Sequence, residues 1–238
     1  MGLFDFFQSE EQKIIKRQRK ITNRDAQPED REAAARWLAD QGSPGALLAL
    51  LARFDVSLDH QLKDKGEKDL VYALASSKGN EMLVPLETWL KKCRSVALPL
   101  RLLEDLAGKN AAIDMACTLL DLERARDDFK PVKKKALLIW LASEKGERCL
   151  EAAAPFLDDF DEGVRYAAAE VIIAQKSDGG RVPLLTVLQN SEEESNRLKI
   201  RICEVFEQRK WAVGDAAETV AGNLPENFRI EAGLVMGI

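Results

Sequence analysis

The sequence has little of the chemistry that most enzymes need. Its 238 residues include a single histidine, His60, and aromatic residues make up only 6%. A Ser-His-Asp or Cys-His arrangement would have to use His60, which falls in a polar stretch that we interpret as a solvated loop. Neither G-x-x-x-x-G-K-[ST] nor G-x-G-x-x-G occurs, so the common nucleotide-binding loops are excluded. The sequence therefore predicts no catalytic residues, no cofactor and no metal.

Cysteines and long apolar runs are also scarce. The four cysteines lie far apart, without a C-x-x-C pair: Cys93, Cys117, Cys149 and Cys203. Each falls in a helical pattern, so we interpret them as reduced core residues of a cytoplasmic protein. The longest apolar runs, 46–52 and 136–142, are much shorter than the roughly 20 residues that span a bilayer. Asp5 interrupts the first apolar run, which argues against a secretory signal peptide.

Charge is plentiful but is not concentrated in one sign. Charged residues make up 32% of the chain and the net charge is −5, spread along its length. Because a nucleic-acid interface needs clustered cations to neutralise phosphates, we expect no such interface.

The sequence does contain a repeated amphipathic pattern, which is clearest in residues 161–190. Five apolar residues follow the 3.6-residue period of a helix: Val164, Ala167, Ala168, Val171 and Ile172. Asp161 and Glu162 precede them, as acidic residues do at a helix N-terminus. Gly179 and Gly180 are expected to end this helix in the left-handed conformation. A second apolar run over 182–188 predicts a second short helix.

Weaker copies of this unit recur along the chain. Helical patterns end at Gly42, Gly79 and Gly146, and each is followed by a second apolar run. These glycines and Gly180 are separated by 37, 67 and 34 residues, and the longer gap leaves room for a less regular unit. Helices shorter than about 12–15 residues are marginal alone, so the pairs need stacked neighbours. The sequence predicts an all-α fold of about six helix pairs.

These motifs resemble HEAT repeats of the phycobilin-lyase type. Residues 161–171 are similar to the D-x-x-V-R-x-x-A-x-x-A/V pattern of a first HEAT helix, and the second-helix pattern occurs at 84–86, 154–156 and 182–184. The resemblance covers roughly residues 28–224, and the whole chain also resembles a group of bacterial HEAT-repeat proteins that suggests no activity. It implies a right-handed α-α superhelix, a HEAT-repeat solenoid. It also implies that Asp161 and Arg165 bridge neighbouring turns as structural residues.

The two ends of the chain differ from the repeats, which we assign to residues 26–224. Residues 1–25 combine apolar residues at 3–7 with six cations over 13–24. We interpret this amphipathic, basic segment as a cap on the first repeat, while docking on a membrane or partner through residues 3–24 stays an alternative. Apolar residues alternate after Pro225, which predicts an extended tail or a small hairpin turning near Gly233 over 225–238.

Three lysines, Lys133, Lys134 and Lys135, open one predicted helix. Cations at a helix N-terminus oppose its dipole, and such a cost can mark a contact site. A solvated charge run is the simpler interpretation, and a partner contact is the alternative.

The leading functional hypothesis is a non-enzymatic adaptor or scaffold that holds another protein along its concave face. Candidate partner-binding residues lie on the predicted second helices: Arg53, Glu87, Lys91, Asp114, Glu151 and Gln189. One alternative is a HEAT-like enzyme or lyase that acts on a nucleic acid or a tetrapyrrole in the groove. The other is a peripheral membrane adaptor that uses the N-terminal segment. The identity of the protein partner does not follow from the sequence.

Overall fold

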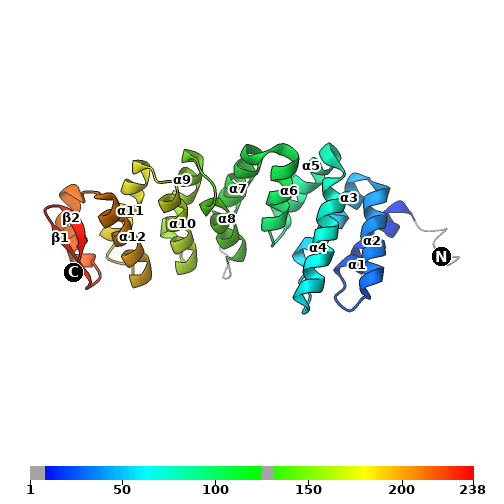
Figure 1. The fold of residues 1–238 in the computed structure, drawn as a ribbon, viewed down its shortest axis with the longest axis horizontal. Helices are drawn as coiled ribbons and strands as arrows, with labels where there is room; N and C mark the ends of the chain where they lie inside the picture. Colours follow the sequence, from blue (N-terminus) through cyan, green and yellow to red (C-terminus); the bar gives the residue numbers. More distant parts are fainter. Residues whose placement is uncertain (1–8, 125–130) are drawn as a thin grey trace. The chain divides into compact units, whose positions relative to one another are not determined.

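The computed structural model describes residues 9–124 and 131–238, and this part of the chain is all-α apart from one small hairpin. Thirteen α-helices lie within the described ranges, and the fold class is the predicted one (Figure 1). Packing divides the chain into two units, residues 1–119 and 120–238. The boundary falls inside α7 (Lys109–Arg124), within the stretch expected to form a single repeat domain.

Three helix pairs build the first unit: α2 with α3, α4 with α5, and α6 with α7. The bounds are α2 Pro28–Gln41, α3 Pro44–Leu51, α4 Gln61–Ser76, α5 Leu83–Lys92 and α6 Ala97–Ala107, with 3-10 turns η2 Ala52–Asp55 and η3 Gly79–Met82. The first helix of each pair packs on the first helix of the next pair, α2 on α4 and α4 on α6. Among the second helices, α3 packs on α5. Leu38, Leu50 and Leu86 are fully buried between these layers, as the amphipathic pattern requires.

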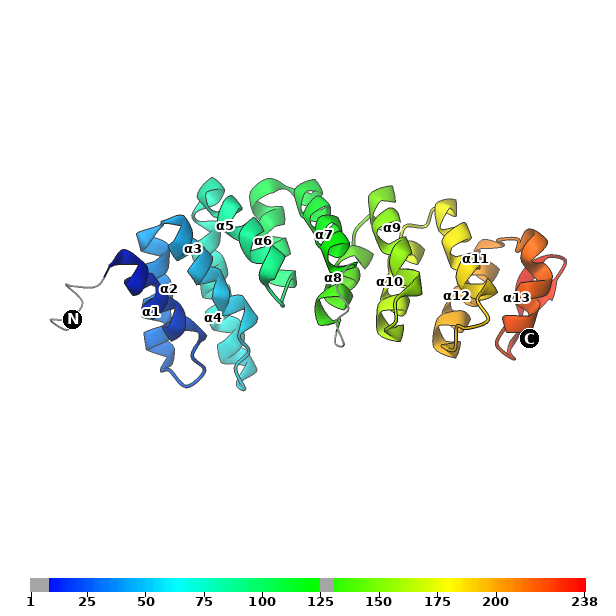
Figure 2. The same ribbon diagram turned by 180° about the vertical axis from the view of Figure 1, so that it is seen from behind.

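The second unit repeats this arrangement. Its helices are α8 Val132–Ala142, α9 Glu147–Ala153, α10 Glu162–Ala174, α11 Arg181–Gln189, α12 Asn196–Arg209 and α13 Ala217–Asn223, with η4 Ala154–Asp158, η5 Asp178–Gly180 and η6 Gly214–Ala216. Helix α10 packs between α8 and α12 (Figure 2), and α11 packs on η4 and α13. In chain order the described helices form six pairs, which agrees with the predicted number. The superhelix and its hand stay a prediction.

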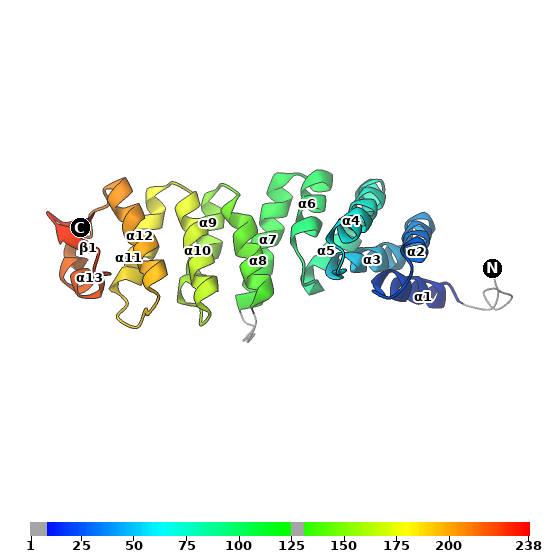
Figure 3. The same ribbon diagram turned by 60° about the horizontal axis from the view of Figure 1, so that its bottom comes forward.

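The first helix, α1 (Glu10–Thr22), lies against the first pair. It packs on α2, α3 and η2 (Figure 3), and Ile21 is 1% exposed at this contact. Ser9 and Gln12 form a capping box at its start, so the helix has a defined N-terminus. This packing fits the cap interpretation for the helical part of residues 1–25. The apolar residues at 3–7 lie outside the described ranges.

Residues 228–237 form an antiparallel hairpin, which is one of the two forms predicted for 225–238, the other being an extended tail. Strand β1 (Phe228–Glu231) pairs with β2 (Leu234–Gly237), with Glu231 opposite Leu234. Ala232 and Gly233 both have positive φ, which suits a two-residue hairpin turn. Val235 is fully buried and β2 packs on α12, so the hairpin covers one side of the last helix pair.

The glycines between paired helices are needed for two different reasons, backbone conformation at three positions and lack of space at a fourth. Gly42, Gly79 and Gly146 have positive φ, at 69°, 54° and 140°, and each lies between the first and second helix of a pair. The expectation for Gly179-Gly180 is wrong, because Lys176 takes the left-handed conformation after α10, while Gly180 has φ −72°. Gly180 is required for space instead, since a Cβ there would lie 2.8 Å from Cγ2 of the buried Ile172.

Candidate functional site

Five of the six predicted partner-binding residues have exposed side chains on second helices. In the first unit, Glu87 and Lys91 lie on α5 and Asp114 lies on α7. In the second unit, Glu151 lies on α9 and Gln189 ends α11. Their exposure leaves them accessible to a partner, as the hypothesis requires.

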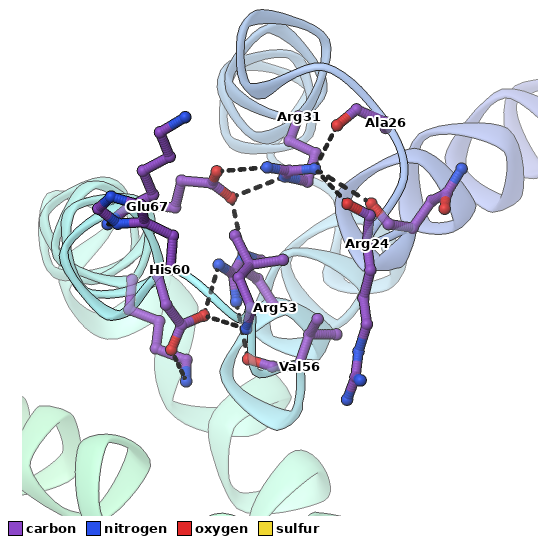
Figure 4. A network of polar contacts seen from close by, with 12 residues as sticks. Arg24, Ala26, Arg31, Arg53, Val56, His60 and Glu67 are labelled. Atoms are coloured by element: carbon purple, nitrogen blue, oxygen red, sulfur yellow. Dashed lines mark hydrogen bonds and ion pairs between the residues drawn. The ribbon is translucent and has the colours of Figure 1, made fainter.

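The sixth residue, Arg53, is buried, so the prediction that it binds a partner is wrong. Its side chain lies in η2, is 1% exposed and contacts groups within the protein (Figure 4). Its guanidinium donates to Glu67 Oε2 at 3.0 Å, to Asp64 Oδ1 at 2.8 Å and to the carbonyl of Val56 at 2.9 Å. A buried guanidinium must be paired in this way, so Arg53 is structural and cannot contact a partner.

Arg31 of α2 completes this buried ion network. It donates to Glu67 through two bonds, Nε to Oε2 at 2.8 Å and Nη2 to Oε1 at 2.7 Å. Its Nη1 donates to three carbonyls of the turn before α2, those of Asn23, Arg24 and Ala26 (Figure 4). The Glu67 carboxylate on α4 therefore lies between two guanidiniums. Burial alone would raise the pKa of Glu67, but the bonds and charges of Arg31 and Arg53 outweigh it and lower that pKa.

The second unit contains an equivalent arrangement around Arg165 of α10. Its Nε and Nη2 donate to Glu193 at 2.7 and 2.9 Å, and its Nη1 donates to the carbonyls of Asp159 and Phe160. Burial would raise the pKa of Glu193, yet the hydrogen bond from Arg165 helps to hold it below its usual value. As in the first unit, an arginine of a first helix joins the preceding turn to a glutamate of the next pair.

Asp161 has the capping role that its position indicated. Its side chain accepts from the backbone N of Val164 at 3.0 Å and lies 3.3 Å from Nζ of Lys135. Asp161 thus joins α10 to α8, while Arg165 joins α10 to the turn at Glu193. Each bridges neighbouring elements, and neither contact depends on the other residue.

Two of the three lysines at the start of α8 are buried, so the interpretation of a solvated charge run is wrong for them. Lys133 and Lys134 are 8% and 7% exposed, and their ammonium groups lie 3.6 Å from Glu123 Oε1 and 3.0 Å from Asp159 Oδ2. The alternative of an outer partner contact fails for the same two residues, because they are buried. These carboxylates compensate the unfavourable charge at the helix N-terminus.

The remaining candidate residues have structural positions. His60 is exposed, and its Nδ1 accepts from the backbone N of Lys63 at the start of α4, so it is an N-cap. All four cysteines are buried, as predicted, and burial raises the pKa of Cys203 to about 12. Within residues 9–124 and 131–238, no group of three or more His, Cys, Asp or Glu side chains could hold a metal ion.

A groove of about 420 Å³ lies on the second-helix side of the second unit, between η4 and α11. It is lined by Ala154, Pro155, Leu157, Asp158, Pro183, Thr186, Val187 and Asn190. Leu157 and Val187 are nearly buried, while Pro155 and Thr186 are open to solvent. The candidate residues Glu151 and Gln189 adjoin this lining in sequence, on α9 and α11. The V-P-L motif predicted the second helix, but no sequence signal gave the hollow between neighbouring pairs.

The groove has a mostly apolar lining with few polar groups. Asp158 is the single titratable side chain among its described lining residues, and it ends η4. Thr186 Oγ1 already donates its proton to the carbonyl of Val182 at 3.1 Å. Asn190 Oδ1 accepts from the backbone N of Glu192, which leaves its amide nitrogen available to an acceptor. The groove therefore offers apolar surface, one negative charge and one amide donor.

A second hollow, of about 640 Å³, lies along α1. Its described lining is Gln12, Ile15, Lys16, Arg19, Lys20 and Asn23, which includes three cations and no acid. Ile15 is 40% exposed on this face, and Lys20 is paired with Asp30 at 2.9 Å. No helix in the described ranges has the length and apolar character to cross a bilayer.

Comparison with known proteins gives no relative. No protein-family model, no curated protein and no solved structure matches this chain. The groove, the hollow along α1 and the exposed side chains are therefore the features that point to a function.

Proposed function

We propose that this protein is a non-enzymatic scaffold that binds a segment of another protein in the groove between η4 and α11. The observation that carries the proposal is the composition of the groove, apolar with Asp158 as the one titratable group of its described lining. Acid–base or nucleophilic catalysis pairs a reactive group with a second group that activates or complements it, and this lining supplies no such pair. The resemblance to HEAT repeats, in which second helices commonly hold protein partners, supports the same function.

The groove suits a short apolar stretch of a partner chain. Its volume of about 420 Å³ falls within the range of pockets that enclose ligands of a few side chains. Pro155 and Pro183 present ring surface without a hydrogen-bond donor, so recognition would depend on side-chain packing. Asp158 favours a cation beside the apolar stretch, and the Asn190 amide can donate to a partner carbonyl.

The chain offers a matched pair of variants to test this proposal. Thr186 follows Val182-Pro-Leu in α11 and lines the groove, while Thr88 follows Val84-Pro-Leu in α5 and does not. Both hydroxyls donate to the carbonyl four residues earlier, at 3.1 and 2.8 Å. Thr186→Arg therefore fills the groove, and Thr88→Arg makes the same exchange elsewhere.

The experiment is quantitative mass spectrometry of proteins that co-purify with the tagged full chain from source cells. A partner should be retained by T88R and fall by about tenfold or more with T186R, since blocking a central contact removes most of the affinity. Calorimetry with the purified partner should likewise show that T88R keeps the binding affinity and that T186R loses most of it. Equal recovery by T186R, or no partner above an untagged control, would count against the groove as a protein-binding site.

Peripheral membrane binding is a second candidate, favoured by the hollow along α1. Lys16 and Arg19 line this hollow together with the partly exposed Ile15, and cations beside apolar surface can bind anionic membrane surfaces. The test is flotation of the full chain with neutral vesicles and with vesicles of about 30 mol % anionic lipid. Flotation with the anionic vesicles alone, lost in Lys16→Glu/Arg19→Glu and kept in the α4 control Lys63→Glu/Lys65→Glu, supports it. No flotation with either vesicle removes it.

A further inference from the structure

Phe160 is the most exposed large apolar residue in the described ranges, at 96%. It lies in the turn between η4 and α10, and hydrogen bonds hold that turn in place. Arg165 Nη1 donates to the carbonyls of Asp159 and Phe160 at 3.0 and 3.1 Å, and the backbone N of Asp161 donates to Asp159 Oδ1 at 3.0 Å. The ring thus projects into solvent from a fixed backbone.

An aromatic side chain in this position has the properties of an interface anchor. Anchors of protein interfaces are enriched in large side chains that bury fully in a pocket of the partner. A turn that is already ordered lowers the entropy lost on binding. The packing of α10 does not use the ring, since Arg165 and Asp161 hold the turn through backbone and polar groups.

The turn that leads into α12 is linked to the turn of Phe160 and carries negative charge. This following turn is joined to the turn of Phe160 by the Arg165–Glu193 pair and by Ser195 Oγ, which donates to Glu162 at 2.9 Å. Two exposed carboxylates on this following turn have no ion-pair or hydrogen-bond partner within the described residues: Glu192 and Glu194. Lys134 and Lys135 do not neutralise them, because both are paired with Asp159 and Asp161. The exposed Arg197 lies 3.7 Å from Glu162, so its charge is also compensated. The outward charge of this edge is therefore negative.

We propose that Phe160 anchors a second protein interface, separate from the groove, whose partner offers an apolar pocket bordered by lysine or arginine. Complementary charge steers such a partner to the edge and rejects acidic ones. An anionic membrane would be repelled by the same carboxylates. In a symmetric contact, a second copy of this chain would bring its own acidic edge against this one.

The test places a photo-crosslinker at the anchor itself. The full chain with Phe160→p-benzoyl-phenylalanine is irradiated in an extract of source cells, and Leu62, which is 78% exposed on α4, carries the same group in the control. The proposal expects one crosslinked protein at position 160, absent at position 62, with the crosslink mapped by mass spectrometry to an apolar pocket bordered by basic residues. Glu192→Lys/Glu194→Lys should lower its yield by about tenfold, as like charges now face each other.

Other outcomes overturn the proposal. These are a yield at position 160 no greater than at position 62, a crosslink to lipid or to a second copy, a pocket with an acidic border, or a yield unchanged by the charge reversal. Circular dichroism of the double variant checks that its fold is intact. Thr186→Arg should leave the crosslink unchanged, so failure of the groove proposal does not decide this one.

Discussion

Arg165 and Glu193 form a two-bond ion pair across 28 positions of the chain, with N–O distances of 2.7 and 2.9 Å. The Glu193 side chain is 2% exposed and that of Arg165 is 17% exposed, so solvent screens the pair little. Glu193 also accepts from the backbone N of Ser195 at 2.7 Å. One carboxylate therefore fixes both the guanidinium of α10 and the turn that leads into α12.

Glu193→Gln is expected to lower the free energy of unfolding by about 3 kcal/mol, because it leaves a largely buried guanidinium without its counter-charge. Urea unfolding followed by circular dichroism measures the change. The control is Glu204→Gln, since Glu204 is 53% exposed and lies 3.6 Å from Arg201, so its loss should be below about 1 kcal/mol. Equal free energies of unfolding for the two variants would show that the buried pair stabilises the protein no more than an exposed pair does.

The acid stability of the first unit should depend on Glu67. Burial would raise the pKa of Glu67, but its bonds to Arg31 and Arg53 lower it below 4.5, the value expected for the unfolded chain. A lowered folded-state pKa gives stability that is present above pH 4.5 and is lost as the pH falls through the folded value. The stabilising contribution of Glu67 is thus complete at neutral pH and disappears in acid.

Glu67→Gln should therefore be less stable than the wild type at pH 7, and the difference should shrink as the pH falls below 4.5. Urea midpoints measured over a pH series give this difference directly. Glu32→Gln, at an exposed pair with Arg36, is the control and should show a small, nearly constant difference. A difference for E67Q that stays constant into acid would contradict the linkage.

Gly180 should not tolerate a side chain. A Cβ there would lie 2.8 Å from Cγ2 of Ile172, which is fully buried and cannot move aside. Gly180→Ala is expected to cost about 1–3 kcal/mol through overpacking. Gly179→Ala is the matched control, because its nearest atoms would be 3.6 and 3.7 Å away, at ordinary contact distance. Thermal unfolding should separate the two variants, and equal melting temperatures would contradict the close approach.

Local patterns predicted the elements of this fold well. The apolar period around Val164 predicted α10, the acidic residue at 161 predicted its N-cap, and the alternation after Pro225 predicted the hairpin. Each of these signals lies within a few residues of the feature it predicts. Burial of the cysteines followed from the same periodicity.

Contacts between neighbouring helix pairs could not be predicted in this way. Local periodicity does not show that Arg53 is buried, because its partners, Asp64 and Glu67, lie 11 and 14 positions further on. A repeated spacing could have indicated two of the other buried pairs. An arginine in the first helix of a pair is matched by a glutamate near the start of the next pair, as Arg31 with Glu67 and Arg165 with Glu193. The groove between η4 and α11 depends on the spacing of whole pairs, which no local pattern encodes.

The lysines at the start of α8 allow the strongest test of this inward pairing. Lys134 and Asp159 lie 3.0 Å apart with side chains only 8% and 12% exposed, so each should depend on the other. Lys134→Met and Asp159→Asn are each expected to destabilise the protein, and the double variant should cost less than the sum. A double-mutant cycle should give a coupling above about 1 kcal/mol. The exposed pair Lys20–Asp30 is the control and should couple by less than about 0.5 kcal/mol. Similar coupling at the two sites would mean that burial adds nothing to the Lys134 pair.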